Sequence, residues 1–237
     1  GWKVGDQLVL GGTNSNYAGD FVTNAKYHDE VLTITSISGK TIYFTNNATG
    51  GTTLQYEHKM PTGYGLKIYA ANLTRNVIFE SENFATIPID QRGHIMLMHN
   101  LAQSISYAAF NGLGRTNKDI LATDPVVNDM GVQVSGGSNV RGRYPIHMHK
   151  AGTNNILAVP TLIKGNAIVD PTSWGIVNHQ SNANIDDNVV FDFFGAAFVT
   201  EDGNELGTFN RNIAIKGRKA TTHTNLDERT LNGDFGY

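Results

Sequence analysis

The sequence predicts an all-β protein, a parallel β-helix with an irregular β lead-in and one long inserted loop. From residue 65 onward, short apolar runs alternate with turn residues, as in Ile-His-Met-His at 146–149 and Asn-Ile-Ala-Ile at 212–215. Two or three such runs recur in every 20–25 residues, and a repeat of this length built from β-type segments is typical of a solenoid. No window sustains an apolar stripe at helical spacing beyond two turns, so little helix is expected.

Residues 1–64 are expected to form the β lead-in. Two β-branched runs, at 31–37 and 41–45, flank Ser-Gly-Lys, which indicates a hairpin. The opening Gly-Trp-Lys-Val-Gly-Asp has the character of neither a signal peptide nor an N-terminal tail. We therefore expect the chain to be part of a longer, multidomain polypeptide.

Residues 65–216 carry the repeat, and one column of it combines imidazoles with a carboxylate. Segments 146–149, 176–179 and 198–201 align at offsets of 30 and 22 residues, which places His149, His179 and Glu201 in register. Aligned residues of stacked coils lie about 4.8 Å apart. We predict that the three strands are parallel, adjacent and in register. Extending the frame back to 96–99 would add His99 to the column.

A second column consists of Asn166, Asn188 and Asn212, at spacings of 22 and 24 residues. Each asparagine precedes three mostly apolar residues, so it marks the same place in successive coils. Stacked asparagines can satisfy their amides along the axis of the coils, and the spacing predicts such a ladder.

Two segments depart from the period. Residues 114–140 are polar and contain Gly and Pro, which predicts a long loop between two coils; long loops in compact folds are more often functional than idle. Residues 217–237 lose the pattern and are expected to form a C-terminal extension. It would lie against the last coil or lead into a further element.

Composition excludes several classes of function. A formal net charge of −3 with 16% charged residues provides no basic field, which argues against a nucleic-acid partner. No apolar run reaches about 18 residues, so membrane insertion by this fragment is not expected. Cysteine is absent, which rules out disulfides, thiolate catalysis and thiolate metal ligands.

The string Arg-Gly-Arg-Tyr-Pro-Ile-His-Met-His-Lys-Ala-Gly at 141–152 and Glu-Asp-Gly-Asn-Glu at 201–205 carry a family resemblance. With them the sequence resembles the parallel β-helix region of the cell-migration-inducing and transmembrane cell-surface hyaluronidases. It is nearer still to bacterial secreted members, which share the insertion seen here at 114–125. The resemblance covers roughly residues 1–216.

The resemblance implies a right-handed parallel β-helix and a secreted, extracellular or cell-surface location. For the animal members it implies depolymerisation of hyaluronan, with calcium as an assisting ion. Two features depart from the family. The eight-glycine domain that usually precedes this region is missing or partial, and the insertion at 114–140 is longer than in the animal enzymes, which leaves the substrate open.

The imidazole–carboxylate column leaves two chemistries open. His149, His179 and Glu201 could bind a divalent metal, zinc if imidazoles dominate and calcium if carboxylates do. They could equally act as general acid and base, because stacked titratable groups move each other's pKa values apart. A solvated polar column without function is the alternative. Strand alternation puts His147 on the face of His149, and Asp202 extends the acidic turn. Candidate catalytic residues are therefore His147, His149, His179, Glu201 and Asp202.

Candidate substrate-binding residues are Arg141, Arg143, Lys150 and Trp174. Guanidinium groups suit a uronate carboxylate, although an arginine that caps a coil by bonding turn carbonyls is about as common. Trp174, directly before Gly175, is expected to be exposed and to stack on sugar rings. His94, which starts a strand after Gly93, has equal claims to a structural and a functional role.

Together these features predict a secreted carbohydrate-active protein that binds and depolymerises an acidic polysaccharide. Paired carboxylates suit hydrolysis, whereas histidine with arginine suits β-elimination beside a uronate, and the residues leave both open. The rival hypothesis is a non-catalytic glycan-binding or structural β-helix module of a larger surface protein.

Overall fold

The computed structural model describes residues 1–13, 27–60, 62–63, 65 and 67–218. The chain divides into two compact units, Gly1–Thr74 and Arg75–Tyr237. Residues 219–237, which make up most of the expected C-terminal extension, lie outside the described residues. Among the described residues, no helix has the length and apolar character needed to cross a membrane.

The first unit is built on an antiparallel sheet. Its strands are β1 (Gln7–Leu10), β2 (Glu30–Ser38), β3 (Thr41–Asn46) and β4 (Ala70–Asn72), in the order β3-β2-β1-β4. Strands β2 and β3 pair antiparallel around the Gly39 turn, which confirms the hairpin expected from the β-branched runs. Leu8 and Val9 of β1 and the alternating residues Leu32 and Ile34 of β2 are buried.

A buried carboxylate fixes the loop that follows β3. Glu30 is 3% exposed. Its carboxylate accepts hydrogen bonds from Nδ2 of Asn46 and from the backbone N–H groups of Gln55 and Tyr56, and it contacts Nε2 of His58 at 2.9 Å. Burial alone would raise the pKa of Glu30, but these hydrogen bonds outweigh it and the pKa is lowered.

The lowered pKa of Glu30 gives the first unit an expected pH dependence. A carboxylate whose folded pKa lies below its unfolded value contributes stability above the unfolded pKa, about 4.3, and that stability is lost as pH falls through the folded pKa. The urea midpoint, followed by Trp2 fluorescence in a Trp174→Phe background, should fall between pH 6 and acid conditions in the parent. A Glu30→Gln variant should start lower and lose less on acidification. Equal pH dependence in both proteins would contradict this assignment.

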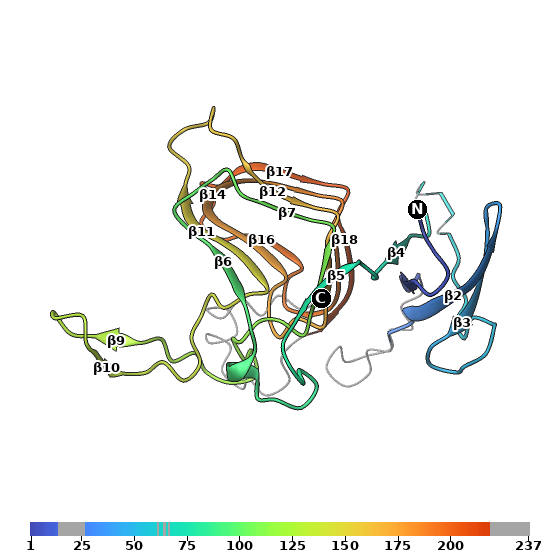
Figure 1. The fold of residues 1–237 in the computed structure, drawn as a ribbon, viewed down its shortest axis with the longest axis horizontal. Helices are drawn as coiled ribbons and strands as arrows, with labels where there is room; N and C mark the ends of the chain where they lie inside the picture. The colour runs from blue at the N-terminus through green and yellow to red at the C-terminus, as the bar shows by residue number, and fades with distance from the viewer. Residues whose placement is uncertain (14–26, 61, 64, 66, 219–237) are drawn as a thin grey trace. The chain divides into compact units, whose positions relative to one another are not determined.

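The described part of the second unit winds through stacked coils with three faces, and Figure 1 shows this winding. The first face contains β6 (Ile95–Leu97), β11 (Ile146–Gly152), the first part of β14 (Ile176–Asp186) and β16 (Phe198–Thr200). The second contains β7 (Ser104–Ser106), β12 (Thr161–Lys164), the rest of β14 and β17 (Leu206–Asn210). The third contains β5 (Val77–Glu80), β8 (Ala108–Asn111), β13 (Ala167–Val169), β15 (Val189–Phe194) and β18 (Ile213–Arg218). A single 3-10 turn, η1 (Ile89–Gln91), lies between β5 and β6.

All neighbouring strands of these faces pair in parallel. On the first face Ile146 lies opposite Ile176, and Ile176 lies opposite Phe198. The predicted parallel register of 146–149, 176–179 and 198–201 is therefore confirmed, and with it an all-β architecture of parallel coils.

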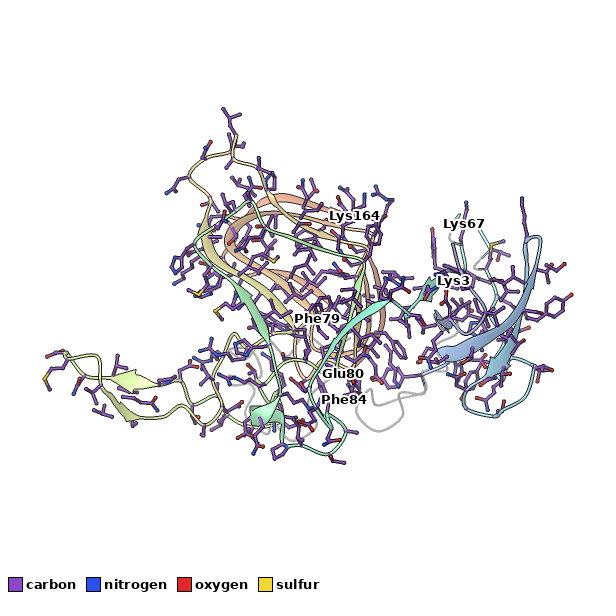
Figure 2. The ribbon with its side chains drawn as sticks, viewed as in Figure 1. Lys3, Lys67, Phe79, Glu80, Phe84 and Lys164 are labelled. Atoms are coloured by element: carbon purple, nitrogen blue, oxygen red, sulfur yellow. The ribbon has the colours of Figure 1, made fainter. Side chains whose placement is uncertain are left out.

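The interior of the coils is a continuous apolar core to which all three faces contribute. Its fully buried members include Ile146 and Ile176 from the first face, Ile163 from the second and Ile168 from the third. Phe110 on β8 is 0% exposed and stacks on Phe79 of β5 with ring centroids 5.3 Å apart. Phe79, labelled in Figure 2, is itself half exposed because β5 is the edge strand of its sheet.

The predicted asparagine ladder is confirmed at the corner between the second and third faces. Nδ2 of Asn166 donates to Oδ1 of Asn188, and Nδ2 of Asn188 donates to Oδ1 of Asn212, each at 3.0 Å. The same oxygens accept the backbone N–H groups of Asn166 and Asn188. The ladder thus satisfies buried backbone and side-chain groups at once and holds the coils in register.

A left-handed bend recurs at the corner after the first face. His99, Lys150 and Gln180 have φ values of 63°, 53° and 48°. Because Ile95 rather than Met96 lies opposite Ile146, His99 occupies the position of Lys150 and not that of His149. The expectation that His99 joins the imidazole column is therefore wrong by one residue.

The insertion at 114–140 contains a hairpin of β9 (Val126–Val127) and β10 (Gln133–Ser135), which projects from the coils in Figure 1. Its base is held by Asn139, which is 2% exposed and donates from Nδ2 to the carbonyls of Asn117, Ile120 and Leu121. Before this base, Gly114 and Arg115 are hydrogen-bonded to the carbonyls of Gly93 and Arg143, and Lys118 reaches the ring of Trp174.

Candidate active site on the outer face of the coils

The two histidines of β11 point away from the core. Ile146 and Met148 are fully buried inside the coils, so alternation along the strand directs His147 and His149 to the outer side of the first face. In register, His149 lies opposite His179 of the next coil, and His147 lies opposite Val177. The predicted shared face of His147 and His149 is confirmed.

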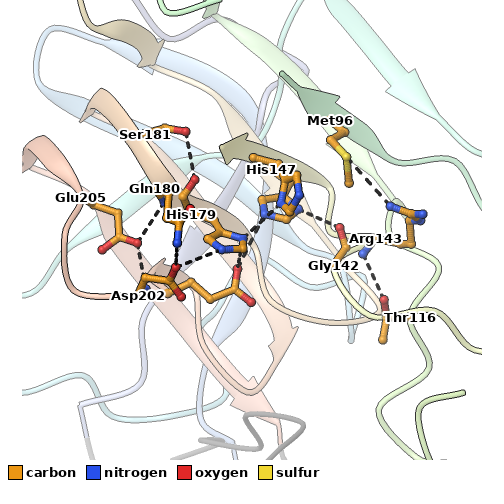
Figure 3. A network of polar contacts seen from close by, with 12 residues as sticks. Met96, Thr116, Gly142, Arg143, His147, His179, Gln180, Ser181, Asp202 and Glu205 are labelled. Atoms are coloured by element: carbon orange, nitrogen blue, oxygen red, sulfur yellow. Dashed lines mark hydrogen bonds and ion pairs between the residues drawn. The ribbon is translucent and has the colours of Figure 1, made fainter. Parts of the chain in front are cut away.

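The column of His149, His179 and Glu201 forms a contact chain. Nδ1 of His149 lies 3.1 Å from Nδ1 of His179, which lies 3.2 Å from Oε2 of Glu201. The other ring nitrogen of His179, Nε2, lies 3.3 Å from Oδ2 of Asp202. His179 therefore offers one nitrogen to each of two carboxylates, and Figure 3 shows it between Asp202 and His147.

His147 is the buried member of the cluster, with a side chain 1% exposed. Its Nδ1 lies 2.8 Å from the carbonyl oxygen of Gly142. A carbonyl only accepts, so Nδ1 must carry the proton and Nε2 presents its lone pair. Nε2 has no hydrogen-bond partner among the described residues and lies 3.6 Å from Oε2 of Glu201. Burial lowers the pKa of His147 to about 3, with the cationic forms of His149 and His179 adding to the effect, so the ring is neutral at pH 7.

Glu201 combines partial burial with several charged neighbours. Its side chain is 27% exposed. Burial raises the pKa of Glu201 and the Asp202 carboxylate adds to the rise, while His179 and Lys118 oppose it. Burial, and then the Glu201 carboxylate, raise the pKa of the Tyr144 hydroxyl, which places the two side chains near one another. A carboxyl with a raised pKa beside a neutral imidazole is the combination that general acid–base chemistry uses.

A small apolar cluster covers the outer side of the coils beside His147. Tyr144 and Trp174 stack with centroids 5.1 Å apart and pack on Val177. Trp174 is only 8% exposed, so the expectation of an exposed tryptophan is wrong: the ring fills the space between Tyr144 and the insertion. Nζ of Lys118, from the insertion, lies 4.6 Å from the Trp174 ring centroid. A pocket of about 340 Å³, lined in part by Trp174, Val199 and Glu201, opens beside this cluster.

The acidic turn after β16 divides into two roles. Glu205 accepts the backbone N–H groups of Gln180, Asp202 and Gly203, so it holds the turn in place. Burial alone would raise the pKa of Glu205, but these hydrogen bonds lower it. Asp202 accepts from Nε2 of Gln180 and keeps its contact with His179. Of the three carboxylates, Glu201 and Asp202 face the imidazoles.

The three basic candidates occupy different positions. Arg141 is paired with Asp124 of the insertion through Nη1 and its backbone N–H, at 3.0 and 2.8 Å. Arg143 extends along the outer side of β6, with Nη1 3.9 Å from Sδ of Met96. Lys150 is exposed in the left-handed bend. The structure brings Arg143 next to the imidazoles and ties Arg141 to the insertion.

Three contributors to the site were not foreseen from the sequence. They are the Gly142 carbonyl that sets the His147 tautomer, the Tyr144 hydroxyl at Glu201, and Lys118 of the insertion. Gly142 and Tyr144 lie within the 141–152 string that carries the family resemblance, so this string is the sequence signal that could have indicated them. Lys118 reaches the site through long-range folding of the insertion, which spacing does not reveal.

Comparison with known proteins supports the superfamily resemblance. A profile described as CEMIP beta-helix matches residues 121–234. The chain is 29% identical over 221 residues to a G8 domain-containing protein of Dictyostelium discoideum, covering 90% of this chain and 15% of that protein. A second such protein is 28% identical over 209 residues. Human Fibrocystin-L is 24% identical over 257 residues, covering 95% of this chain and 6% of that protein.

The chain spans between 6% and 15% of the length of the curated relatives it matches. These relatives are therefore much longer proteins in which the matching region is one part, as the expectation of a longer, multidomain polypeptide requires.

Proposed function

We propose that this chain is a module of a longer extracellular or cell-surface protein that binds and depolymerises an acidic polysaccharide at the His147–His149–His179–Glu201–Asp202 cluster. One observation carries the proposal. Three imidazoles and two carboxylates from three successive coils converge on one outer face, beside a pocket to which Glu201 contributes.

The roles follow from protonation and access. Glu201, whose pKa is raised mainly by burial, holds a proton more readily than an ordinary carboxyl and lines the pocket. It is the proposed acid. The pKa of His149 is lowered, mainly by burial and by His179, so it is neutral at pH 7 and suits the base. His147, fixed by Gly142, orients Glu201 from the buried side.

The donor set fits zinc better than calcium. The nearest ring nitrogens of His147, His149 and His179 all lie within 4.8 Å of one another. Two nitrogens on tetrahedral zinc are about 3.4 Å apart, close to the 3.1 Å between His149 and His179. The bonded Nδ1 and unpartnered Nε2 of His147 match the usual outer-shell arrangement of a metal-ligating histidine. Calcium needs six or more oxygens, and Glu205 is already occupied by backbone donors.

As the alternative to acid–base chemistry by His149 and Glu201 alone, His147, His149 and His179 would hold zinc, the fourth position would be left to water, and Glu201 would remain beside it as the proton carrier. When bound, zinc supplies a Lewis acid and lowers the pKa of coordinated water. The metal is expected to copurify at a substantial fraction of one per chain, measured by elemental analysis. Removing it with a chelator should lower the melting temperature by about 5 °C. The zinc proposal would be contradicted if the protein is purified without metal and if neither chelator nor added zinc changes its melting temperature or its turnover.

The activity itself is tested with a panel of acidic glycans, including hyaluronan, incubated with the full-length protein. Chain shortening is expected, measured by size-exclusion chromatography. Absorbance of unsaturated uronates in the products would identify elimination, and its absence with shortened chains would identify hydrolysis. Binding without chain shortening across the panel would favour the rival, a non-catalytic glycan-binding module.

One specific observation favours the rival hypothesis, a non-catalytic glycan-binding or structural module. Arg141, a predicted carboxylate-binding residue, is paired with Asp124, as in a structural coil cap. We retain the catalytic proposal because the three imidazoles lie together with Glu201 and Asp202 on the outer face of the coils, beside a pocket that Glu201 lines. The finer family features, right-handed winding of the coils and a nearer likeness to bacterial secreted members, belong to the same proposal.

A further inference from the structure

We propose that Arg115 and Arg143, with His94 beside them, form a subsite for an anionic group of the polysaccharide, a carboxylate or a sulfate. This subsite deepens the proposed function and rests on it. It lies on the outer side of the first face, next to the histidine cluster. It assigns a role to Arg115 and His94, which take no part in the chemistry described above.

Backbone hydrogen bonds bring together three segments that are distant in the sequence. The N–H of Gly114 donates to the carbonyl of Gly93 at 2.8 Å, and the N–H of Arg115 donates to the carbonyl of Arg143 at 2.9 Å. The stem of the insertion is thereby held between the start of β6 and the turn before β11. His94, Arg115 and Arg143 consequently occupy one small region, and all three are partly buried.

Among the residues that the structure describes, neither guanidinium in this region has an acidic partner. Elsewhere in the second unit Arg141 faces Asp124, Arg211 faces Asp187 and Arg218 faces Asp170. Within the described part of the chain, no carboxylate oxygen lies within 4.0 Å of Arg115 or Arg143, and Nε of Arg143 is buried without a hydrogen-bond partner. A buried donor without an acceptor is costly, and an incoming anion would satisfy it with a charge-assisted bond.

With respect to the described residues, the region therefore carries positive charge that no neighbouring carboxylate compensates. Burial, together with Arg115 and then Arg143, lowers the pKa of His94 to about 4. His94 is thus neutral at pH 7 and adds a hydrogen-bond donor without a third charge. Two planar guanidinium forks with a neutral imidazole suit the planar oxygens of a carboxylate or the tetrahedral oxygens of a sulfate.

The subsite is adjacent to the proposed chemistry. Nη1 of Arg143 lies 3.9 Å from Sδ of Met96, and Met96 is the register partner of His147. Neighbouring strands are about 4.8 Å apart, so an anion held by Arg143 would lie roughly one strand from His147. Figure 3 shows Arg143 on one side of His147, with His179 and Asp202 on the other. A sugar chain crossing the coils would place its acidic group on Arg143 and the neighbouring linkage over the histidines.

The test uses polymers that share one backbone: dextran, carboxymethyl dextran and dextran sulfate. Binding to the full chain is measured by isothermal titration calorimetry for the parent, Arg115→Met and Arg143→Met. Arg211→Met is the matched control, because it removes the same charge from an exposed pair at another corner of the coils. Circular dichroism checks the fold of each variant. Should Arg143→Met fail to fold, Arg115→Met decides, since its guanidinium makes no hydrogen bond in the described part of the chain.

Each subsite variant is expected to weaken binding of at least one anionic dextran by about 10-fold to 100-fold, the size of one or two lost charge-assisted hydrogen bonds. Comparing the two anionic polymers identifies carboxylate or sulfate as the preferred group, and neutral dextran should be insensitive. Unchanged affinity in Arg115→Met, or an equal loss in Arg211→Met, would overturn the subsite. A failure of the proposed function can be distinguished from a failure of the subsite. In that case the binding of anionic dextran would still depend on the two arginines, but the protein would shorten no glycan.

Discussion

Replacing His149 by alanine is expected to lower turnover on the acidic glycan by about 10²–10⁴-fold, the usual size of a general acid–base contribution, while the fold survives. His149 lies on the outer side of the coils, where its Nδ1 contacts Nδ1 of His179, so the core is untouched. Initial rates of chain shortening measure the effect. His99→Ala is the matched control, because His99 is an exposed histidine at the adjacent bend and should leave the rate within about twofold.

A Glu201→Gln variant should lose activity to a similar degree, because the amide keeps the shape of the side chain and cannot transfer a proton. The double variant should lose less than the product of the two single losses, since residues that act as one unit are not additive. A His149→Ala protein that degrades the glycan at the parent rate, or one that merely unfolds, would show that the column is scaffold.

Much of the coil architecture could be predicted because a stacked fold turns sequence period into spatial contact. The offsets of 30 and 22 residues between Ile146, Ile176 and Phe198 correspond directly to the observed parallel pairing. The offsets of 22 and 24 residues between the three asparagines correspond to the observed ladder at the next corner. Where a coil contains an insertion, the sequence period no longer fixes which residues of neighbouring coils lie opposite each other. His99 was misaligned by one residue because the 114–140 segment separates its coil from the next and removes the length constraint.

The site could be predicted only in part, for a related reason. His147, His149, His179 and Glu201 come from repeating positions, so spacing brought them together. The surroundings of these residues come from the insertion, which has no period. Lys118 of the insertion lies over the face of the Trp174 ring. The ring is therefore buried, whereas its position before Gly175 had predicted an exposed side chain. Arg141 is likewise paired with Asp124 of the insertion, a contact that the spacing of the repeat does not reveal.

Replacing Asn188 by alanine is expected to destabilise the second unit by about 3 kcal/mol or more. Asn188 is 1% exposed and occupies the middle of the ladder. Its Oδ1 accepts from the backbone N–H and Nδ2 of Asn166, and its Nδ2 donates to the carbonyl of Ile163 and to Oδ1 of Asn212. Alanine leaves several of these buried groups without a partner, at about 1–3 kcal/mol for each group that water cannot reach.

Urea unfolding followed by Trp174 fluorescence, in a Trp2→Phe background, measures this loss. Asn188→Asp should be at least as damaging, because the new carboxylate cannot donate to Ile163 and a buried charge costs more than a buried amide. Asn154→Ala is the control: Asn154 is exposed in the loop between β11 and β12, and its loss should change stability by less than about 0.5 kcal/mol. If Asn188→Ala and Asn154→Ala unfold at the same urea concentration, the asparagine ladder does not hold the coils together, and the apolar interior alone must do so.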